Sequence, residues 1–237
     1  MNENLNQQSS TYTKEISREF FKNVYAYMFG ALIISGVLAS YCGTPEFFTN
    51  YFTTSAGGIS PLFYVVMFSP LALGLIIQSA YMKLSYATLL GLFVAYSALM
   101  GVSLSVIFLV YDLPTLASTF FVSAGAFAGM AILGYTTKTD LSKMGSMLYM
   151  VFIGIFIAGI VNMFMQNSMM DFVISVLGVF VFTGLTAYHM QQLKNISKET
   201  SISSLDRQKL SLVGGLTLYI LFVNLFLSLL RLVGGRD

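Results

Sequence analysis

The segment "LSLVGGLTLYILFVNLFLSLLRL" (residues 210–232) decides the fold, because it has no charged side chain before Arg231. A helix that spans a bilayer needs about 20 mostly apolar residues, and this segment exceeds that length. The rest of the chain has the same character, since 56% of its residues are hydrophobic and 9% are charged. A soluble domain has about 25% charged residues. The sequence therefore predicts a protein whose solvent is lipid.

Six further apolar runs precede this segment, and all are too long and too uniformly apolar for membrane-spanning β-strands. The predicted fold class is an all-α membrane protein with seven transmembrane helices. A polar tail, residues 1–23, precedes the predicted membrane domain, residues 24–236. The predicted spans are Val24–Cys42, Pro61–Tyr81, Tyr86–Tyr111, Thr115–Tyr135, Met144–Met165, Phe172–His189 and Leu210–Leu232.

The basic residues predict the orientation of the spans. All but two of the 12 Lys and Arg residues lie in the N-terminal tail or in every second loop after it, and the other two are Arg231 and Arg236. Because basic residues collect on the cytoplasmic side, we expect a cytoplasmic N-terminus and an external C-terminus. The net charge of +2 is then a topology signal. The polar segments are too short to bind a nucleic acid or to form a soluble catalytic domain.

The residues that usually form catalytic and cofactor sites are scarce. A single histidine, His189, excludes a zinc centre built on three histidines, and a single cysteine, Cys42, excludes a CxxC redox pair. The chain also lacks the HExxH and GxSxG motifs of hydrolases. We therefore predict no catalytic residue, no bound metal and no cofactor, and expect that the protein is not an enzyme.

Most of the polar residues of the last span share one helical face. The members of this stripe follow one another at steps of 4, 3, 4 and 3 residues, which keeps them in line on a helix. They are Thr217, Leu221, Asn224, Ser228 and Arg231, and only Leu221 is apolar. Two hypotheses fit the stripe: its side chains hydrogen-bond neighbouring helices, or they line a water-filled path for ions.

Pairs of small residues four positions apart predict close contacts between helices, because inside lipid helices associate largely through small side chains and hydrogen bonds. These pairs are Gly91 with Ala95, Gly101 with Ser105, Gly125 with Gly129, and Gly154 with Ala158.

Three segments carry a family resemblance. They are "FAGMAILGYTTKTDLSKMGSMLYMVFIGIFIAGIVNMF" (127–164), "TGLTAYHMQQLK" (183–194) and "GGLTLYILFVNLFLSLLRLVGGR" (214–236). They resemble the Bax inhibitor-1 family, in particular its bacterial members, over roughly residues 80–236. The resemblance implies a seven-helix bundle with a central last helix in the bacterial inner (plasma) membrane. It also implies a pH-sensitive leak of calcium, which in eukaryotic members is linked to the control of cell death.

The pH sensor of that family is a pair of aspartates, one in a "YD" context and one within "LYLDFIN". The matching positions here carry His189 in "AYHMQ" and Leu221 in "LYILFVN". Calcium prefers anionic oxygen ligands, which neither residue supplies. The resemblance therefore predicts weaker calcium binding and an absent or altered pH response. Besides His189 and Leu221, the candidate positions of a pore or sensor are Tyr188, Tyr219, Asn224, Thr217, Ser228 and Arg231.

His189 itself allows two interpretations. An imidazole titrates at about pH 6.5 and becomes cationic in acid. His189 would therefore respond to acid by gaining a positive charge, whereas an aspartate responds by losing a negative one. The C-terminus of a helix, where we expect this residue, favours a cation. The alternative is an interfacial histidine that only hydrogen-bonds groups of the following loop.

Three functional hypotheses remain open. The first is a weak path for calcium or other cations, and the second is a non-conducting regulator that binds other membrane proteins, such as a quality-control protease. The regulator would use the tail Met1–Asn23 and a predicted loop, Gln191–Leu210, the segments long enough to present a partner surface. The third, a secondary transporter, requires inverted repeats or broken helices, and the sequence shows neither clearly.

Overall fold

The computed structural model describes the backbone of residues 2–234 and the side chains of residues 13–234. This part of the chain forms nine helices, of which α2 and α5 are short. Their bounds are α1 Asn2–Cys42, α2 Pro45–Phe52, α3 Pro61–Ala80, α4 Tyr86–Leu104, α5 Ile107–Val110, α6 Leu113–Thr136, α7 Ser142–Met165, α8 Ser168–Lys198 and α9 Ser204–Gly234. Seven segments of the described chain are helical, long and apolar enough to cross a membrane, which confirms the predicted fold class.

Local sequence signals explain several of these helix ends. Thr44 caps α2 by accepting a hydrogen bond from the Phe47 amide, and Ser85 caps α4 in the same way. Proline begins both α2 and α3, where its missing N–H costs nothing. At the other end of α7, Gln166 takes a left-handed conformation with φ of 50°, which stops the helix before α8 begins.

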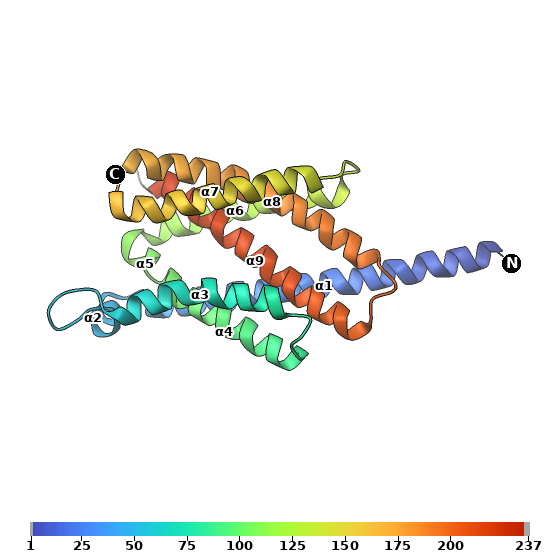
Figure 1. Cartoon of the computed structure of the whole chain (residues 1–237), viewed down its shortest axis with the longest axis horizontal. Helices are drawn as coiled ribbons and strands as arrows, with labels where there is room; N and C mark the ends of the chain where they lie inside the picture. The colour runs from blue at the N-terminus through green and yellow to red at the C-terminus, as the bar shows by residue number, and fades with distance from the viewer. Residues whose placement is uncertain (1, 235–237) are drawn as a thin grey trace. The chain divides into compact units, whose positions relative to one another are not determined.

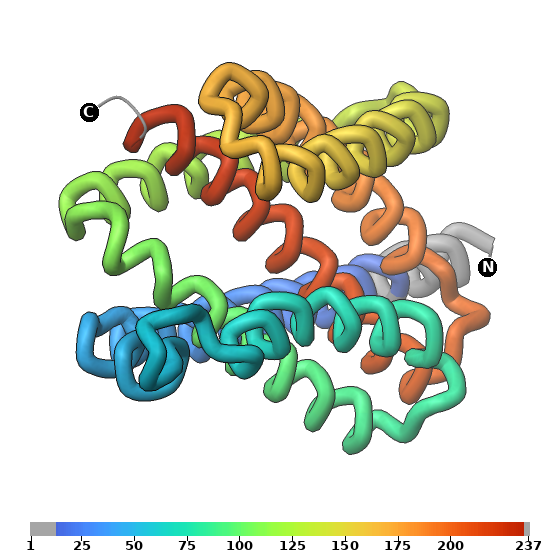
Figure 2. Tube along the Cα trace, turned by 60° about the vertical axis from the view of Figure 1, so that its left-hand side comes forward, coloured from blue at the N-terminus to red at the C-terminus, as the bar shows by residue number. Residues whose placement is uncertain are grey.

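The chain divides into two compact units. Unit 1 comprises residues 1–112 and 199–219, and therefore contains α1 to α5 and the first half of α9. In unit 1, α4 packs against both α1 and α3, and a short turn joins α3 to α4 (Figure 2). A Cβ atom at Gly101 would lie 2.7 Å from the Ser35 carbonyl oxygen, and one at Gly215 would lie 2.7 Å from that of Val24. Glycine therefore lets α4 and α9 approach the backbone of α1 closely.

Unit 2 comprises residues 113–198 and 220–237, and its described helices are α6, α7, α8 and the second half of α9. In unit 2, α8 packs along both α6 and α7 (Figure 1). A Cβ atom at Gly134 on α6 would collide with the Ala187 backbone of α8. One at Gly178 on α8 would lie 2.5 Å from the Ser228 hydroxyl of α9. Close backbone approach again requires glycine at these two crossings.

The last helix supplies much of the core. In α9, 56% of the most apolar window is buried, whereas the corresponding window of α7 has no buried residue. Both halves contribute, since Leu216 and Leu218 in unit 1 are fully buried and so is Leu225 in unit 2. The last helix therefore has the largest buried share among the seven apolar segments of the described chain.

Two helices extend further than the hydropathy pattern predicts. The expected loop Gln191–Leu210 is wrong, because α8 continues to Lys198 and only residues 199–203 separate it from α9. Leu193 and Ser197 remain buried on this polar end, so one face of the helix still has a packing partner. Likewise α1 has 41 residues, about 60 Å, roughly twice the thickness of the hydrocarbon core.

The small-residue pairs are confirmed only in part. Gly101 makes the close contact described above, but a Cβ atom at Gly91, Gly125, Gly129 or Gly154 would meet no described atom within 4 Å. Spacing alone does not distinguish a face that meets another helix from one that meets lipid.

Candidate functional site

The candidate residues fall into separate parts of the molecule. Thr217 and Tyr219 belong to unit 1, whereas His189, Leu221, Asn224 and the remaining candidates belong to unit 2. In unit 2 they form two clusters along α8, which carries Asp171 in its first turn and His189 eighteen residues later, about 27 Å along the axis. We name them the Arg231 cluster and the His189 cluster.

The His189 cluster consists of His189, its neighbour Tyr188, Tyr149 of α7 and Gln192. The Tyr149 hydroxyl lies 2.6 Å from His189 Nε2, so phenol and imidazole share a hydrogen bond. The ring centroids of Tyr188 and Tyr149 lie 5.2 and 5.9 Å from that of the imidazole. Gln192 donates a hydrogen bond to the Tyr188 hydroxyl. The partners of the imidazole are thus aromatic, without a carboxylate among these contacts.

The position of His189 differs from the prediction in one respect. We expected it at the end of its helix, and one of the two interpretations gave it hydrogen bonds to loop groups, but α8 runs nine residues further. The imidazole therefore does not lie at the negative end of the helix dipole, and its hydrogen bond goes to α7 instead of a loop. The prediction that the dipole of the helix favours a cation at His189 is wrong.

Leu221, the second of the two predicted sensor positions, is buried in α9 with 5% of its surface exposed. It offers neither a charge nor an oxygen atom. Within residues 13–234, no group of three or more His, Cys, Asp or Glu side chains lies close enough to hold a metal ion. These side chains do not form the anionic oxygen cage that calcium prefers.

The polar residues of α9 bond mainly to their own helix. The hydroxyl of Thr217 donates to the Val213 carbonyl at 2.9 Å. Asn224 donates to the Ile220 carbonyl at 2.8 Å, and Ser228 donates to that of Asn224 at 2.8 Å. Such bonds to the preceding turn satisfy the donors without a partner helix. Among the described residues these side chains donate no hydrogen bond to another helix, so the hypothesis of interhelical hydrogen bonds is not supported for them.

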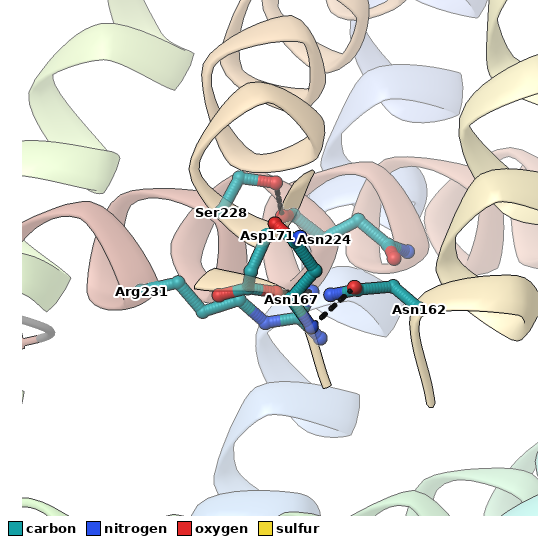
Figure 3. A network of polar contacts seen from close by, with 6 residues as sticks. All are labelled: Asn162, Asn167, Asp171, Asn224, Ser228 and Arg231. Carbon is teal, nitrogen blue, oxygen red and sulfur yellow. Dashed lines mark hydrogen bonds and ion pairs between the residues drawn. The ribbon is translucent and has the colours of Figure 1, made fainter. Parts of the chain in front are cut away.

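The Arg231 cluster joins the beginning of α8 to the end of α9 (Figure 3). Its members are Asn162, Asn167, Asp171, Asn224, Ser228 and Arg231. An Arg231 guanidinium nitrogen lies 3.7 Å from an Asp171 carboxylate oxygen, and both side chains are about half exposed. Asp171 is in the first turn of α8 and Arg231 in the last turn of α9, so each charge is favoured by its own helix dipole. Because solvent screens the pair, its contribution to stability is at most about 1 kcal/mol.

Two asparagines order the turn beside this ion pair (Figure 3). The Asn167 amide donates to the Asn162 side-chain oxygen at 3.0 Å, and the Asn167 side chain accepts from the Met170 amide at 3.0 Å. The second bond caps the start of α8. The sequence pattern did not identify Asp171 as a partner of Arg231. The sequence did contain a signal for this pair, because the sixth span begins with an acid, Asp171, and the seventh ends with a base, Arg231.

Three buried hydroxyls have no hydrogen-bond partner among the described residues. They belong to Thr119 and Ser175 in unit 2 and to Tyr219 in unit 1. Tyr219 is fully buried, and its ring packs edge-on against Tyr96 with centroids 6.2 Å apart. Buried hydroxyls of this kind commonly bind internal water.

Sequence reasoning also missed the residues that support the His189 cluster. Gln191 accepts a hydrogen bond from the Leu141 amide at 2.9 Å and donates one to the Thr139 carbonyl at 2.7 Å, which ties the α6–α7 loop to α8. A Cβ atom at Gly145 would lie 2.6 Å from the Tyr188 ring. Glycine is therefore required where this ring crosses α7.

Asp140 stabilises the same loop. Its carboxylate accepts a hydrogen bond from the Ser142 amide at 2.9 Å, just before α7 begins. The hydrogen bonds from Ser142 lower the pKa of Asp140 below its ordinary value.

Comparison with known proteins decides the family. The model of the family described as "Inhibitor of apoptosis-promoting Bax1" matches residues 17–237. The chain belongs to the Bax inhibitor-1 family. Among its relatives, a protein of Borreliella burgdorferi is 40% identical over 93% of this chain and 94% of its own length. "Inner membrane protein YbhL" of Escherichia coli is 38% identical over 92% of each chain. A Bax inhibitor-1 protein with seven apolar helices is a multi-pass membrane protein.

Proposed function

We propose that this protein is a bacterial inner-membrane cation-leak protein in which calcium binding and the pH response are much weaker than in family members with the aspartate pair. The observation that carries the proposal is the His189 cluster, where two tyrosine rings and no carboxylate contact the partly buried imidazole at the proposed first sensor position. The family resemblance supports the leak itself. The proposal involves no catalysed reaction and no cofactor.

The chemistry of the two sensor positions supports the weakened response. Two close carboxylates share a proton, because both cannot ionise cheaply, and this coupling makes such a pair sensitive to pH near neutrality. With His189 and Leu221 in their place, neither the shared proton nor an anionic calcium ligand exists. The hydrogen bond to Tyr149 also engages Nε2 of His189, and the Leu221 side chain is buried.

A slow leak would use the neutral polar groups that remain. Asn224 and Ser228 keep oxygen lone pairs on the stripe of α9, and Ser175 has a buried hydroxyl with no partner among the described residues. Groups of this kind support water and weakly bound monovalent ions better than calcium, which requires several anionic ligands. We therefore propose that the leak favours monovalent cations.

The relatives and the charge pattern support a location in the inner membrane and an orientation within it. The Escherichia coli relative is named an inner membrane protein, and we propose the same membrane for this chain. The basic residues favour a cytoplasmic N-terminus and an external C-terminus. In this orientation the His189 cluster lies toward the cytoplasm and the Arg231 cluster toward the exterior.

Purified full-length protein in liposomes loaded with a calcium dye or a potassium dye tests the proposal. We expect a potassium leak that exceeds the calcium leak and changes less than about twofold between pH 6 and 8, because no coupled carboxylate pair titrates. His189→Ala should leave that pH profile unchanged. No flux of either ion would refute the leak. A calcium flux that varies steeply with pH and loses this dependence in His189→Ala would refute the weakened sensor.

One observation favours the second candidate, a non-conducting regulator that binds other membrane proteins such as a quality-control protease. Part of the tail and part of the predicted loop, the two segments expected to present a partner surface, line one hollow in unit 1. Crosslinking in intact cells distinguishes the candidates. A stable partner, combined with no ion flux in liposomes, would support the regulator and exclude the leak.

A further inference from the structure

Unit 1 contains a hollow of about 340 Å³ between the N-terminal half of α1 and the start of α9. This volume lies at the lower end of the range for small-ligand sites, about 300 to 1,000 Å³. We name it the α1–α9 hollow. It is lined by Glu15, Ile16, Glu19, Phe20 and Asn23 of α1, by Thr200 and Ile202 of the connection, and by Ser204, Arg207 and Gln208 of α9.

The charged residues of α1 are sorted between two adjacent stripes. Glu15 and Glu19, one turn apart, line the hollow. Lys14, Arg18 and Lys22 follow one another at the same spacing on the next stripe and do not line it. The structure gives the two glutamates no hydrogen bond or ion pair with any described residue. Two carboxylates thus face the hollow without a cationic partner in the described chain.

The opposite wall is held in place by its own hydrogen bonds. Arg207 donates to the Glu199 carbonyl at 2.5 Å, and the Glu199 carboxylate accepts from the Ser201 hydroxyl at 2.8 Å. Ser203 caps α9 by accepting from the Asp206 amide at 3.1 Å. The guanidinium of Arg207, the one cation among the lining residues, is therefore engaged with the connection that it orders.

The remaining lining selects the kind of cation. Ile16 and Ile202 are partly buried and Phe20 is almost fully buried, so they provide an apolar surface beside the carboxylates. An apolar wall suits a hydrocarbon stem, and the carboxylates suit a compact ammonium with several N–H donors. A bare metal ion would find only two carboxylates and no histidine or cysteine in the lining.

We propose that the α1–α9 hollow binds a primary ammonium group carried on an aliphatic stem. Such a group occurs in free polyamines and in lysine side chains of a protein partner. Glu15 and Glu19 pair with the ammonium, and Ile16, Phe20 and Ile202 pack against the stem. This site is independent of the leak, because all of its residues belong to unit 1 and none belongs to the two clusters along α8.

The composition of the chain provides a clean reporter for this site. The sequence contains no tryptophan, so Gln208→Trp, at a lining residue outside the proposed contacts, places a single indole at the hollow. Full-length protein with this substitution is placed in phosphatidylcholine nanodiscs, because a neutral lipid does not itself attract polyamines. The probes are spermidine, a blocked alanine–lysine–alanine tripeptide and inorganic phosphate. Calorimetry on the native chain repeats each titration without a reporter.

We expect saturable binding of spermidine or the lysine tripeptide that weakens as salt increases, because the carboxylates are exposed. Each of Glu15→Gln and Glu19→Gln should weaken it by up to about fivefold, since an exposed ion pair contributes at most about 1 kcal/mol. Glu46→Gln, in α2 and outside the lining, is the matched control and should change nothing. Tighter binding of the tripeptide would identify a lysine of a partner as the source, and tighter binding of spermidine a free polyamine.

Three results would overturn the proposal. They are binding of phosphate without either amine, calorimetric heat from neither amine, and amine binding that is unchanged when both glutamates are replaced. A far-ultraviolet circular dichroism spectrum and a gel-filtration profile that match the native chain establish that each variant is folded.

Discussion

The two clusters along α8 differ in their ionisable groups, because one contains an ion pair and the other an imidazole without a carboxylate partner. At the Arg231 cluster, a carboxylate and a guanidinium are half exposed and 3.7 Å apart, and each lies at a favourable helix end. At the His189 cluster, two tyrosine rings contact the partly buried imidazole, and the Leu221 side chain on α9 is buried and has no polar atom. Burying a charge without a partner costs several kcal/mol. Unit 2 thus has a half-exposed ion pair at one end of α8 and a hydrogen bond between a tyrosine and the imidazole at the predicted sensor position.

The largest expected effect concerns the close packing next to the His189 cluster. In Gly134→Val, the new side chain collides with the Ala187 backbone, two residues from His189. We expect a loss of about 3 kcal/mol in the free energy of unfolding, as for severe overpacking. Gly154→Val makes the same change on α7, where a Cβ atom meets no described atom within 4 Å, and should cost far less. Equilibrium unfolding in mixed micelles measures both, and equal losses would contradict the packing described for α6 and α8.

The next effect tests the hydrogen bond of His189. Tyr149→Phe keeps the ring contacts and removes only the hydroxyl, which should lower the free energy of unfolding by about 1 kcal/mol. Tyr41→Phe, on an exposed tyrosine of α1, is the control and should be neutral. An unchanged stability of Tyr149→Phe in the same unfolding experiment would show that the imidazole is not held as described.

The ion pair at the other end of α8 should matter less. Arg231→Gln removes a half-exposed charge, and we expect a loss below about 1 kcal/mol that shrinks further in high salt. The salt dependence is the distinguishing measurement, because Tyr149→Phe should show none. A loss larger than that of Tyr149→Phe, independent of salt, would reverse the contrast between the two clusters.

The smallest effect is a pH dependence at the α6–α7 loop. Because Ser142 lowers the pKa of Asp140 in the folded state, the ionised Asp140 stabilises the fold above its unfolded pKa, about 3.9. That contribution is lost as the pH falls through the lower, folded pKa. Asp140→Asn should therefore differ from the native chain at pH 6 and converge with it in strong acid. A difference that stays constant between pH 6 and pH 2.5 would contradict this origin.

The sequence predicts the seven spans because hydropathy is a local property, and it predicts the stripe on α9 because helical spacing is regular. The contacts that support His189 could not be predicted from the sequence. They depend on Gly145 meeting the Tyr188 ring and on Gln191 bonding the α6–α7 loop, and these contacts form only after unit 2 has folded. The end of α8 was missed because polar residues after His189 stay helical on a buried face that includes Leu193. Hydropathy identifies what enters lipid, whereas contacts between distant segments decide which side chains bond.

Calcium flux through liposomes containing the His189→Asp/Leu221→Asp variant tests the central claim most directly. The account predicts that the native chain passes little calcium at any pH between 6 and 8. The double variant should gain a calcium leak with a clear pH dependence, because it restores the aspartate pair that the family resemblance implies, and paired carboxylates bind calcium and share a proton. Each single variant lacks the second carboxylate and serves as the control. A native chain that already passes calcium as fast as the double variant, with the same pH profile, would contradict the account.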